Sequence, residues 1–176
     1  MHSQAGLPGD RSLKRSRADK DCASSDIVAQ ERLCVTSAME SLTVISDFVS
    51  SVAQRLNLDG DQTFALQVAV DEACTNVIEY AYEGRTDGEI CIALCKSEDQ
   101  AVVVTIQDYG RSFDPDSVVR PDTTAPLHKR QEGGLGLFLM ERLMDSVHFA
   151  FDPRRGNILT MRKGKATQKV GRLPTS

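Results

Sequence analysis

The sequence has no tryptophan, only three histidines, and no hydrophobic run approaching the length of a membrane-spanning helix. Such a helix needs about 20 mostly apolar residues, so we expect no membrane-embedded segment. The polar N-terminus lacks the apolar stretch of a secretory signal peptide. His2, His128 and His148 are far apart in the sequence, which argues against a histidine-based metal centre. The sequence therefore predicts a soluble, cytoplasmic protein.

Cysteine is present in an odd number, five, and no two cysteines have C-x-x-C spacing. The five are Cys22, Cys34, Cys74, Cys91 and Cys95. A disulfide framework or a structural zinc site would show an even set or paired spacing. We therefore expect these side chains to be small buried hydrophobic groups in a reducing cytoplasm.

Acidic residues dominate the body of the chain. Residues 27–160 contain 11 Lys/Arg and 21 Asp/Glu, a net charge of −10, whereas the two ends are basic. A protein that binds nucleic acid directly usually presents a basic surface, so this function is disfavoured. The length of 176 residues suits one domain with its own core. We predict a disordered leader (1–26), a domain (27–163) and a flexible basic tail (164–176).

Hydrophobic periodicity predicts five strands and three helices. The strands are expected at 27–35, 89–96, 101–108, 147–151 and 157–162. The helices are expected at 38–56, with Thr36 or Ser37 as N-cap, at 63–82, with Asp61 as N-cap, and at 137–144. Short polar connectors between strands favour antiparallel hairpins. The pattern predicts an α+β fold, a two-layer sandwich of a mixed, mostly antiparallel sheet with helices on one face.

The helix at 63–82 carries an apolar stripe formed by Leu66, Val70, Cys74, Val77 and Ala81. Glu72 and Asn76 lie one turn apart at the edge of this stripe, and Asp71 points further toward the polar side. A carboxylate and a carboxamide in this position are either a solvated pair or part of a site.

Two glycine-containing segments follow. Asp108 ends an apolar strand and Gly110 comes directly after it, which fits either a ligand-binding carboxylate or an ordinary turn. Gly133, Gly134 and Gly136 precede and open the last helix, where exposed N–H groups favour a phosphate. An ordinary loop-to-helix turn explains these glycines equally well. Lys129 and Arg130, just before them, could screen phosphate charge or be a solvated pair.

Together, the segments 70–82, 108–115 and 133–140 resemble the N, G1 and G2 boxes of the GHKL ATPase superfamily, whose fold is also called the Bergerat fold. Within it, they are most similar to the anti-sigma-factor serine/threonine kinases of bacterial partner-switching systems. The resemblance covers roughly residues 27–162. One departure is Tyr80, where many relatives have histidine; we expect Tyr80 toward the apolar side of its helix.

The resemblance implies roles for the motif residues. Asn76 would hold the Mg²⁺ that bridges the ATP phosphates, and Glu72 would be the general base for the attacking hydroxyl. Asp108 would bind the adenine amine, with Gly110 allowing close approach. The glycines at 133, 134 and 136 would let a lid close over the phosphates.

The resemblance also implies partners. The substrate would be a small anti-sigma-factor antagonist phosphorylated on Ser or Thr, the client a sigma factor, and the protein itself a homodimer. An alternative function is a nucleotide-gated binding protein of the same fold without kinase turnover. The carboxylate of Glu72 argues against this alternative, because a pure binding protein does not need a base there.

Overall fold

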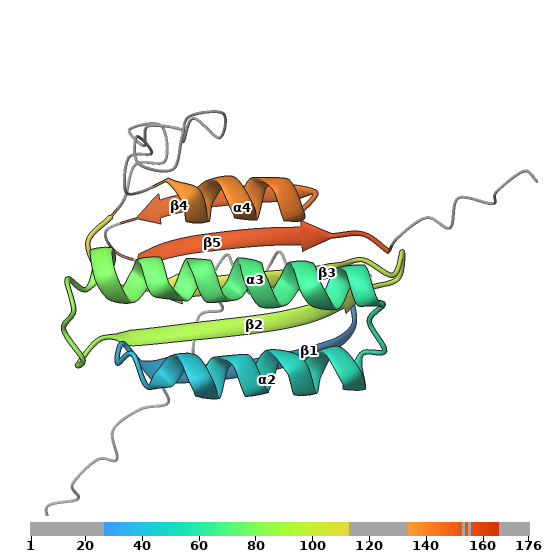
Figure 1. Ribbon diagram of the computed structural model, residues 1–176, viewed down its shortest axis with the longest axis horizontal. Coiled ribbons are helices and arrows are strands. Elements are labelled where there is room, and N and C mark those ends of the chain that lie inside the picture. Colours follow the sequence, from blue (N-terminus) through green and yellow to red (C-terminus); the bar gives the residue numbers. More distant parts are fainter. Residues whose placement is uncertain (1–26, 113–133, 153, 155, 166–176) are drawn as a thin grey trace, which may run out of the picture.

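The computed structural model describes residues 27–112, 134–152, 154 and 156–165. These residues form a two-layer α+β sandwich, with the helices on one face of a single sheet (Figure 1). The elements are β1 (Ile27–Thr36), α2 (Ser41–Arg55), α3 (Gly60–Asn76), the π-helix η1 (Val77–Ala81), β2 (Glu89–Ser97), β3 (Val102–Asp108), α4 (Leu135–Leu143), β4 (Ser146–Asp152) and β5 (Gly156–Lys163). The predicted fold class is confirmed. None of the helices in these ranges is long and apolar enough to cross a membrane.

The sheet has five strands in the order β1-β2-β3-β5-β4, and every neighbouring pair in it is antiparallel. The hairpins β2–β3 and β4–β5 are therefore confirmed, whereas the expected mixed sheet is wrong for the described strands. A connection through one helix, such as β3–α4–β4, leaves its two strands parallel. Here β5 lies between β3 and β4, so these two parallel strands never pair.

The core lies between the sheet and the helices. Alternate strand residues face the helices, among them Ile90, Ile92 and Leu94 of β2, because side chains alternate between the faces of a sheet. The predicted stripe of α3 is buried at Leu66, Val70 and Cys74. Beyond Cys74 the buried positions are Ile78 and Tyr82, and Val77 and Ala81 are only partly buried.

The shift in the stripe follows from a change of helix type. The helix does not continue as an α-helix to residue 82 but changes to a π-helix, with Tyr82 N–H donating to the Val77 carbonyl five residues back at 2.9 Å. The wider turn rotates the residues that follow. Tyr80 is consequently 62% exposed, and the expectation that it lies toward the apolar side is wrong. Single π-turns inside helices are frequent at functional sites.

Two predicted helix caps are also wrong. The N-cap of α3 is Asp59 instead of Asp61: Gln62 N–H donates to Asp59 Oδ1 at 2.8 Å, and Asp59 N–H donates to Gln62 Oε1 at 3.2 Å. Thr36 is the last residue of β1, and α2 begins only at Ser41. The strand continues further than expected because its pairing with β2 extends to Thr36.

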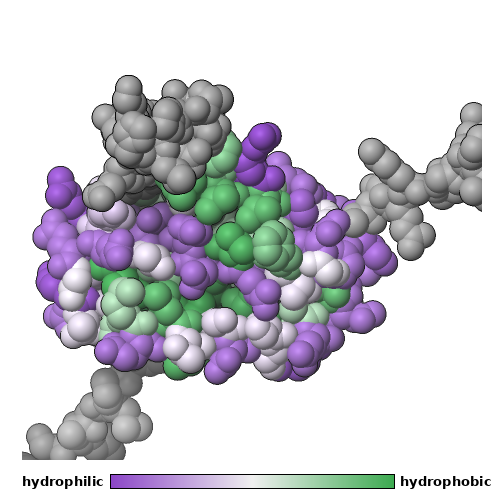
Figure 2. Space-filling model, in the orientation of Figure 1, coloured by the Kyte–Doolittle hydropathy of each residue, from purple (hydrophilic) through white to green (hydrophobic). Residues whose placement is uncertain are grey.

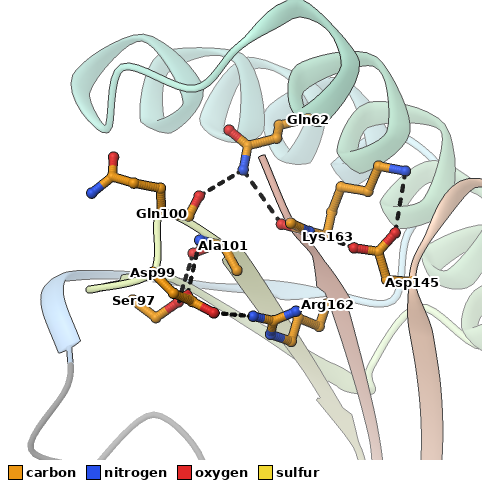
Figure 3. A network of polar contacts seen from close by, with 9 residues as sticks. Gln62, Ser97, Asp99, Gln100, Ala101, Asp145, Arg162 and Lys163 are labelled. Atoms are coloured by element: carbon orange, nitrogen blue, oxygen red, sulfur yellow. Dashed lines mark hydrogen bonds and ion pairs between the residues drawn. The ribbon is translucent and has the colours of Figure 1, made fainter. Parts of the chain in front are cut away.

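Gln62 also ties the start of α3 to the sheet (Figure 3). Its Nε2 donates to the carbonyl oxygens of Gln100 at 2.8 Å and Lys163 at 3.4 Å. Lys163 Nζ pairs in turn with Asp145 at 3.5 Å. This network fixes α3 against the start of β3, at the end of that strand remote from Asp108.

The cysteines depart from the prediction. Cys34 of β1 and Cys91 of β2 are register partners and are joined by a disulfide, with their Cα atoms 4.1 Å apart. Cys95 is disulfide-bonded as well, whereas Cys74 is free and buried, as expected. Cys22 lies outside the described residues. Sequence spacing could not show the Cys34–Cys91 bond, because the pairing of β1 with β2 is what brings these two residues, 57 apart in sequence, together.

Candidate functional site

The predicted pair on α3 lies against the start of α4. Glu72 and Asn76 are both partly buried, and Asp71 is exposed. Gly136 lies beside the pair: a Cβ at that position would be 2.7 Å from Glu72 Oε2 and 3.2 Å from Asn76 Nδ2. The structure therefore brings together Glu72, Asn76 and Gly136, three predicted site residues from two separate motifs. A side chain at position 136 would displace the ends of these two polar side chains.

Glu72 has an electrostatic environment suited to a base. Its pKa is raised first by burial and second by the neighbouring carboxylate of Asp71. A higher pKa makes the ionised carboxylate a better proton acceptor near neutral pH. The amide oxygen of Asn76, one turn away, is a hard ligand of the kind that Mg²⁺ prefers. The residues present at this edge of α3 thus fit a magnesium ion next to a general base.

Asp108 ends β3 and is 5% exposed. Within the described part of the chain, its hydrogen bonds end on one oxygen: Oδ1 accepts from Gly110 N–H and from Asn157 Nδ2, each at 2.8 Å. Burial raises the pKa of Asp108, and these two hydrogen bonds oppose that rise. The bond from Gly110 is that of the ordinary turn foreseen from the sequence. It leaves Oδ2 as the oxygen that could accept from a ligand amine.

Asn157 is a site residue that the sequence did not reveal. It lies in β5 directly opposite Asp108 and is 8% exposed. Besides Asp108, its Nδ2 contacts the Gly110 carbonyl at 3.2 Å, and its Oδ1 accepts from Ser112 Oγ at 3.0 Å. Asn157 therefore fixes both the carboxylate and the turn after it. Only the register of β3 with β5 shows this, and no local pattern around residue 157 does.

The turn after Asp108 is fastened to the end of the helix that carries Glu72. Arg111 N–H donates to the Ala81 carbonyl at 2.7 Å, and Tyr109 N–H donates to Tyr82 Oη at 2.9 Å. A Cβ on Gly110 would lie 2.5 Å from the Ala81 carbonyl oxygen, so a side chain there would separate the turn from η1. The π-helix thus positions the carboxylate turn relative to α3.

The last predicted glycines lie at the start of α4. Gly134 is the N-cap residue, with φ of 80°, a left-handed conformation that favours glycine. The helix begins at Leu135, two residues earlier than expected, and Phe138 N–H donates to the Gly134 carbonyl. Gly133, Lys129 and Arg130 lie outside the described residues, so their predicted roles at the phosphates stay predictions.

A groove of about 380 Å³ follows the opposite flank of α3, between α2 and α3 (Figure 2). Its lining includes Ile45 and Val49 from α2 and Val68 and Asp71 from α3. Asp71 therefore faces a different side of the helix from Glu72. Asp71 is exposed and Glu72 is partly buried, as expected, and the predicted role of Glu72 as the base stays a prediction.

Comparison with known proteins identifies the family of the chain. Residues 35–163 match the family model of the histidine kinase-like ATPase domain. The chain is 38% identical to "Serine-protein kinase RsbW" of Halalkalibacterium halodurans over 136 residues, which are 74% of this chain and 80% of that protein. It is 39% identical to the Bacillus subtilis protein of the same name over 112 residues, 61% of this chain and 69% of that protein.

A solved structure supports the fold. The chain superimposes on the structure of the RsbU and RsbW domains of a Mycobacterium tuberculosis protein with a TM-score of 0.57 and 14% identity, covering 78% of this chain and 32% of that one. With the family match extending over most of the described domain, the chain belongs to the histidine kinase-like ATPase family and, within it, to the RsbW-type serine-protein kinases.

Proposed function

We propose that this protein is an ATP-dependent serine/threonine protein kinase that acts as a cytoplasmic anti-sigma factor. It phosphorylates an anti-sigma-factor antagonist, sequesters a sigma factor and works as a homodimer. The observation that carries the proposal is the meeting of Glu72, Asn76 and Gly136 at one edge of α3. A base, a metal ligand and a glycine-bearing helix start are the parts that phosphoryl transfer from ATP requires.

In this proposal the adenine end is held at β3. Asp108 Oδ2 accepts a hydrogen bond from the exocyclic amine, while Asn157 and Gly110 hold the carboxylate through Oδ1. The narrow approach at Gly110 keeps the turn against η1. Recognition by a buried hydrogen-bonding group disfavours bases that lack the amine, because the carboxylate would then be left unpaired.

At the other end, Asn76 and Gly136 hold the phosphates. The Asn76 amide oxygen would ligate Mg²⁺, which neutralises charge on the phosphates when bound. The exposed N–H groups beginning at Gly134 would face phosphate oxygens. Glu72 takes the proton from the substrate hydroxyl as its oxygen bonds to the γ-phosphorus; the bond from that phosphorus to the β–γ bridging oxygen breaks, and ADP leaves.

The test is transfer of label from γ-labelled ATP to a serine or threonine of candidate antagonist proteins, with binding of ATP measured in parallel. Asn76→Ala should abolish Mg²⁺-dependent ATP binding. ATP binding without transfer to any antagonist would favour the nucleotide-gated binding protein. Absence of ATP binding by the folded wild-type protein would contradict the proposal altogether.

The client is tested separately. Size-exclusion chromatography with light scattering should show a dimer. The protein should form a stable complex with one sigma factor only when it is not bound to the antagonist. A monomer that binds no sigma factor would remove the anti-sigma role while leaving kinase activity standing.

A further inference from the structure

The disulfide Cys34–Cys91 lies on the sheet face away from the helices. Neighbouring residues Leu33 and Val35 pack against the core, and side chains alternate along a strand, so Cys34 points to the other face. Cys34 is exposed, whereas Cys91 is 6% exposed. A small thiol or disulfide in solution can therefore reach the bridge from the Cys34 side.

The bridge lies at a corner where β1, β2 and the end of η1 meet. Just beyond Cys34, Ser37 N–H donates to the Gly88 carbonyl at 2.9 Å, and Gly88 N–H donates to Ser37 Oγ at 3.0 Å. Just before Cys91, Tyr82 Oη donates to the Glu89 carbonyl at 2.8 Å and accepts from Glu89 N–H at 3.2 Å. The disulfide thus closes a corner that hydrogen bonds hold on both sides.

The same corner supports the carboxylate turn of the nucleotide site. Tyr82 Oη, already bonded to Glu89, also accepts from Tyr109 N–H, directly after Asp108. In the sheet, Cys91 pairs with Gln107 and its neighbour Ile90 pairs with Asp108. The bridge is therefore one residue along the ladder from the carboxylate that would bind adenine.

We propose that Cys34–Cys91 is a reversible thiol–disulfide site whose reduction weakens nucleotide binding. The proposal rests on the proposed function and cytoplasmic location, since a disulfide in a reducing compartment is usually transient, catalytic or redox-sensing. With the bridge open, β1 is held to β2 at this corner by hydrogen bonds alone. The Tyr82–Glu89 contact, and with it the turn at Tyr109, then loses a covalent support.

The chemistry is thiol–disulfide exchange with a low-molecular-weight thiol. Its thiolate attacks Cys34 Sγ, the S–S bond breaks, and Cys91 leaves as thiolate and takes a proton. A second thiolate attacks the small-molecule sulfur of the mixed disulfide and releases Cys34. The protein gains two electrons and two protons, and two thiols become one disulfide. Oxidation is the reverse, with a low-molecular-weight disulfide as oxidant.

Glu89 requires one precaution. Its carboxylate and the two sulfurs lie within 4.8 Å of one another, and two thiolates with a carboxylate are a possible ligand set for a thiophilic cation. Experiments on the reduced protein therefore contain a chelator, so that a trapped cation does not imitate the bridge.

The first experiment equilibrates the full chain with graded ratios of reduced to oxidised small thiol, alkylates free thiols, and assigns them by peptide mass spectrometry. We expect Cys34 and Cys91 to convert together and reversibly. Cys74→Ala is the control, because Cys74 is a free cysteine buried in the core and its loss should leave this conversion unchanged. A Cys34–Cys91 pair that remains alkylated as thiols at every ratio overturns the proposal.

The second experiment measures ATP affinity in both redox states. Reduction should weaken binding by at least about fivefold, the lower end of ordinary coupling between sites, and Cys34→Ser should bind like the reduced protein in either buffer. Equal affinity of the oxidised and reduced wild-type protein overturns the proposal.

Amide hydrogen exchange separates this inference from the proposed function. In the reduced wild-type protein, the amides of Ser37, Gly88 and Tyr109 should exchange faster, whether or not ATP binds. If neither redox state binds ATP, the proposed function fails, and the exchange data still decide whether the bridge controls the corner. Unchanged exchange at all three amides contradicts that control.

Discussion

Replacing Asn157 by alanine removes the donor that reaches Asp108 from the neighbouring strand. The Asn157 Nδ2 to Asp108 Oδ1 distance is 2.8 Å, and Asp108 is 5% exposed, so water replaces the lost donor poorly. A hydrogen bond to an ionised group contributes about 1.5–3 kcal/mol. Asn157→Ala should therefore lower the free energy of unfolding by about this amount at pH values where Asp108 is ionised.

The size of the loss should depend on pH. Burial has already raised the pKa of Asp108, and the bond from Asn157 opposes that rise, so its removal raises the pKa further. When a carboxyl group has a higher pKa in the folded than in the unfolded state, the free energy of unfolding falls as pH rises from the unfolded-state pKa through the folded-state pKa. The deficit of Asn157→Ala should consequently grow through this range and shrink in acid, where Asp108 is protonated in both proteins.

Urea unfolding of the wild-type and variant proteins across pH measures this deficit in stability. ATP titrations over the same pH range measure the effect on nucleotide affinity. The acid limb of ATP affinity should move to higher pH in Asn157→Ala, with a largest difference of about 10- to 150-fold. Ser112→Ala is the matched control, since it removes only the bond to Asn157 Oδ1. A deficit that does not change with pH would refute the role assigned to Asn157.

Three further substitutions test the neighbouring contacts. Asp71→Asn removes a charge that raises the pKa of Glu72, so the acid limb of phosphoryl transfer at saturating ATP should move to lower pH; an unmoved limb would exclude Glu72 as the titrating base. Gly136→Ala places a Cβ 2.7 Å from Glu72 Oε2. Because the flexible Glu72 side chain can move away, stability should change little, but the rate of phosphoryl transfer should fall about 100-fold. A normal transfer rate would contradict the contact. Gly110→Ala would bring a Cβ within 2.5 Å of the Ala81 carbonyl oxygen. Because backbone atoms yield little, the free energy of unfolding should fall by about 1–3 kcal/mol and ATP affinity should fall as well. A variant with unchanged stability and unchanged ATP affinity would refute the close approach.

The elements of the fold were largely predictable, because their signal is local. The strand predicted at 89–96 is observed at Glu89–Ser97, and the strand predicted at 157–162 is observed at Gly156–Lys163. Both segments are short runs rich in apolar residues, and each has three consecutive buried positions, 90–92 in β2 and 157–159 in β5. The errors at the helix ends lie where local hydrogen bonding, and not the apolar pattern, decides the outcome. The cap at Asp59 and the π-turn before Tyr82 depend on backbone conformation that periodicity does not encode.

The candidate site was predictable to the extent that its motifs were. Glu72, Asn76 and Gly136 could be identified from three boxes in the right order, and the structure brings them together. Asn157 could not, because an asparagine after a glycine is an ordinary turn residue until the sheet register is known. The Cys34–Cys91 bridge was missed for the same reason: two cysteines far apart in sequence become partners only through strand pairing.

The central claim is that Glu72 is the base of a protein kinase, and one comparison tests it directly. Phosphoryl transfer from labelled ATP to the antagonist is measured for the wild type, Glu72→Gln and the control Asp71→Asn, with ATP affinity determined for each. We predict that Glu72→Gln binds ATP like the wild type but transfers phosphate about 100- to 10,000-fold more slowly, while Asp71→Asn retains transfer near neutral pH. Transfer by Glu72→Gln at the wild-type rate would contradict the account.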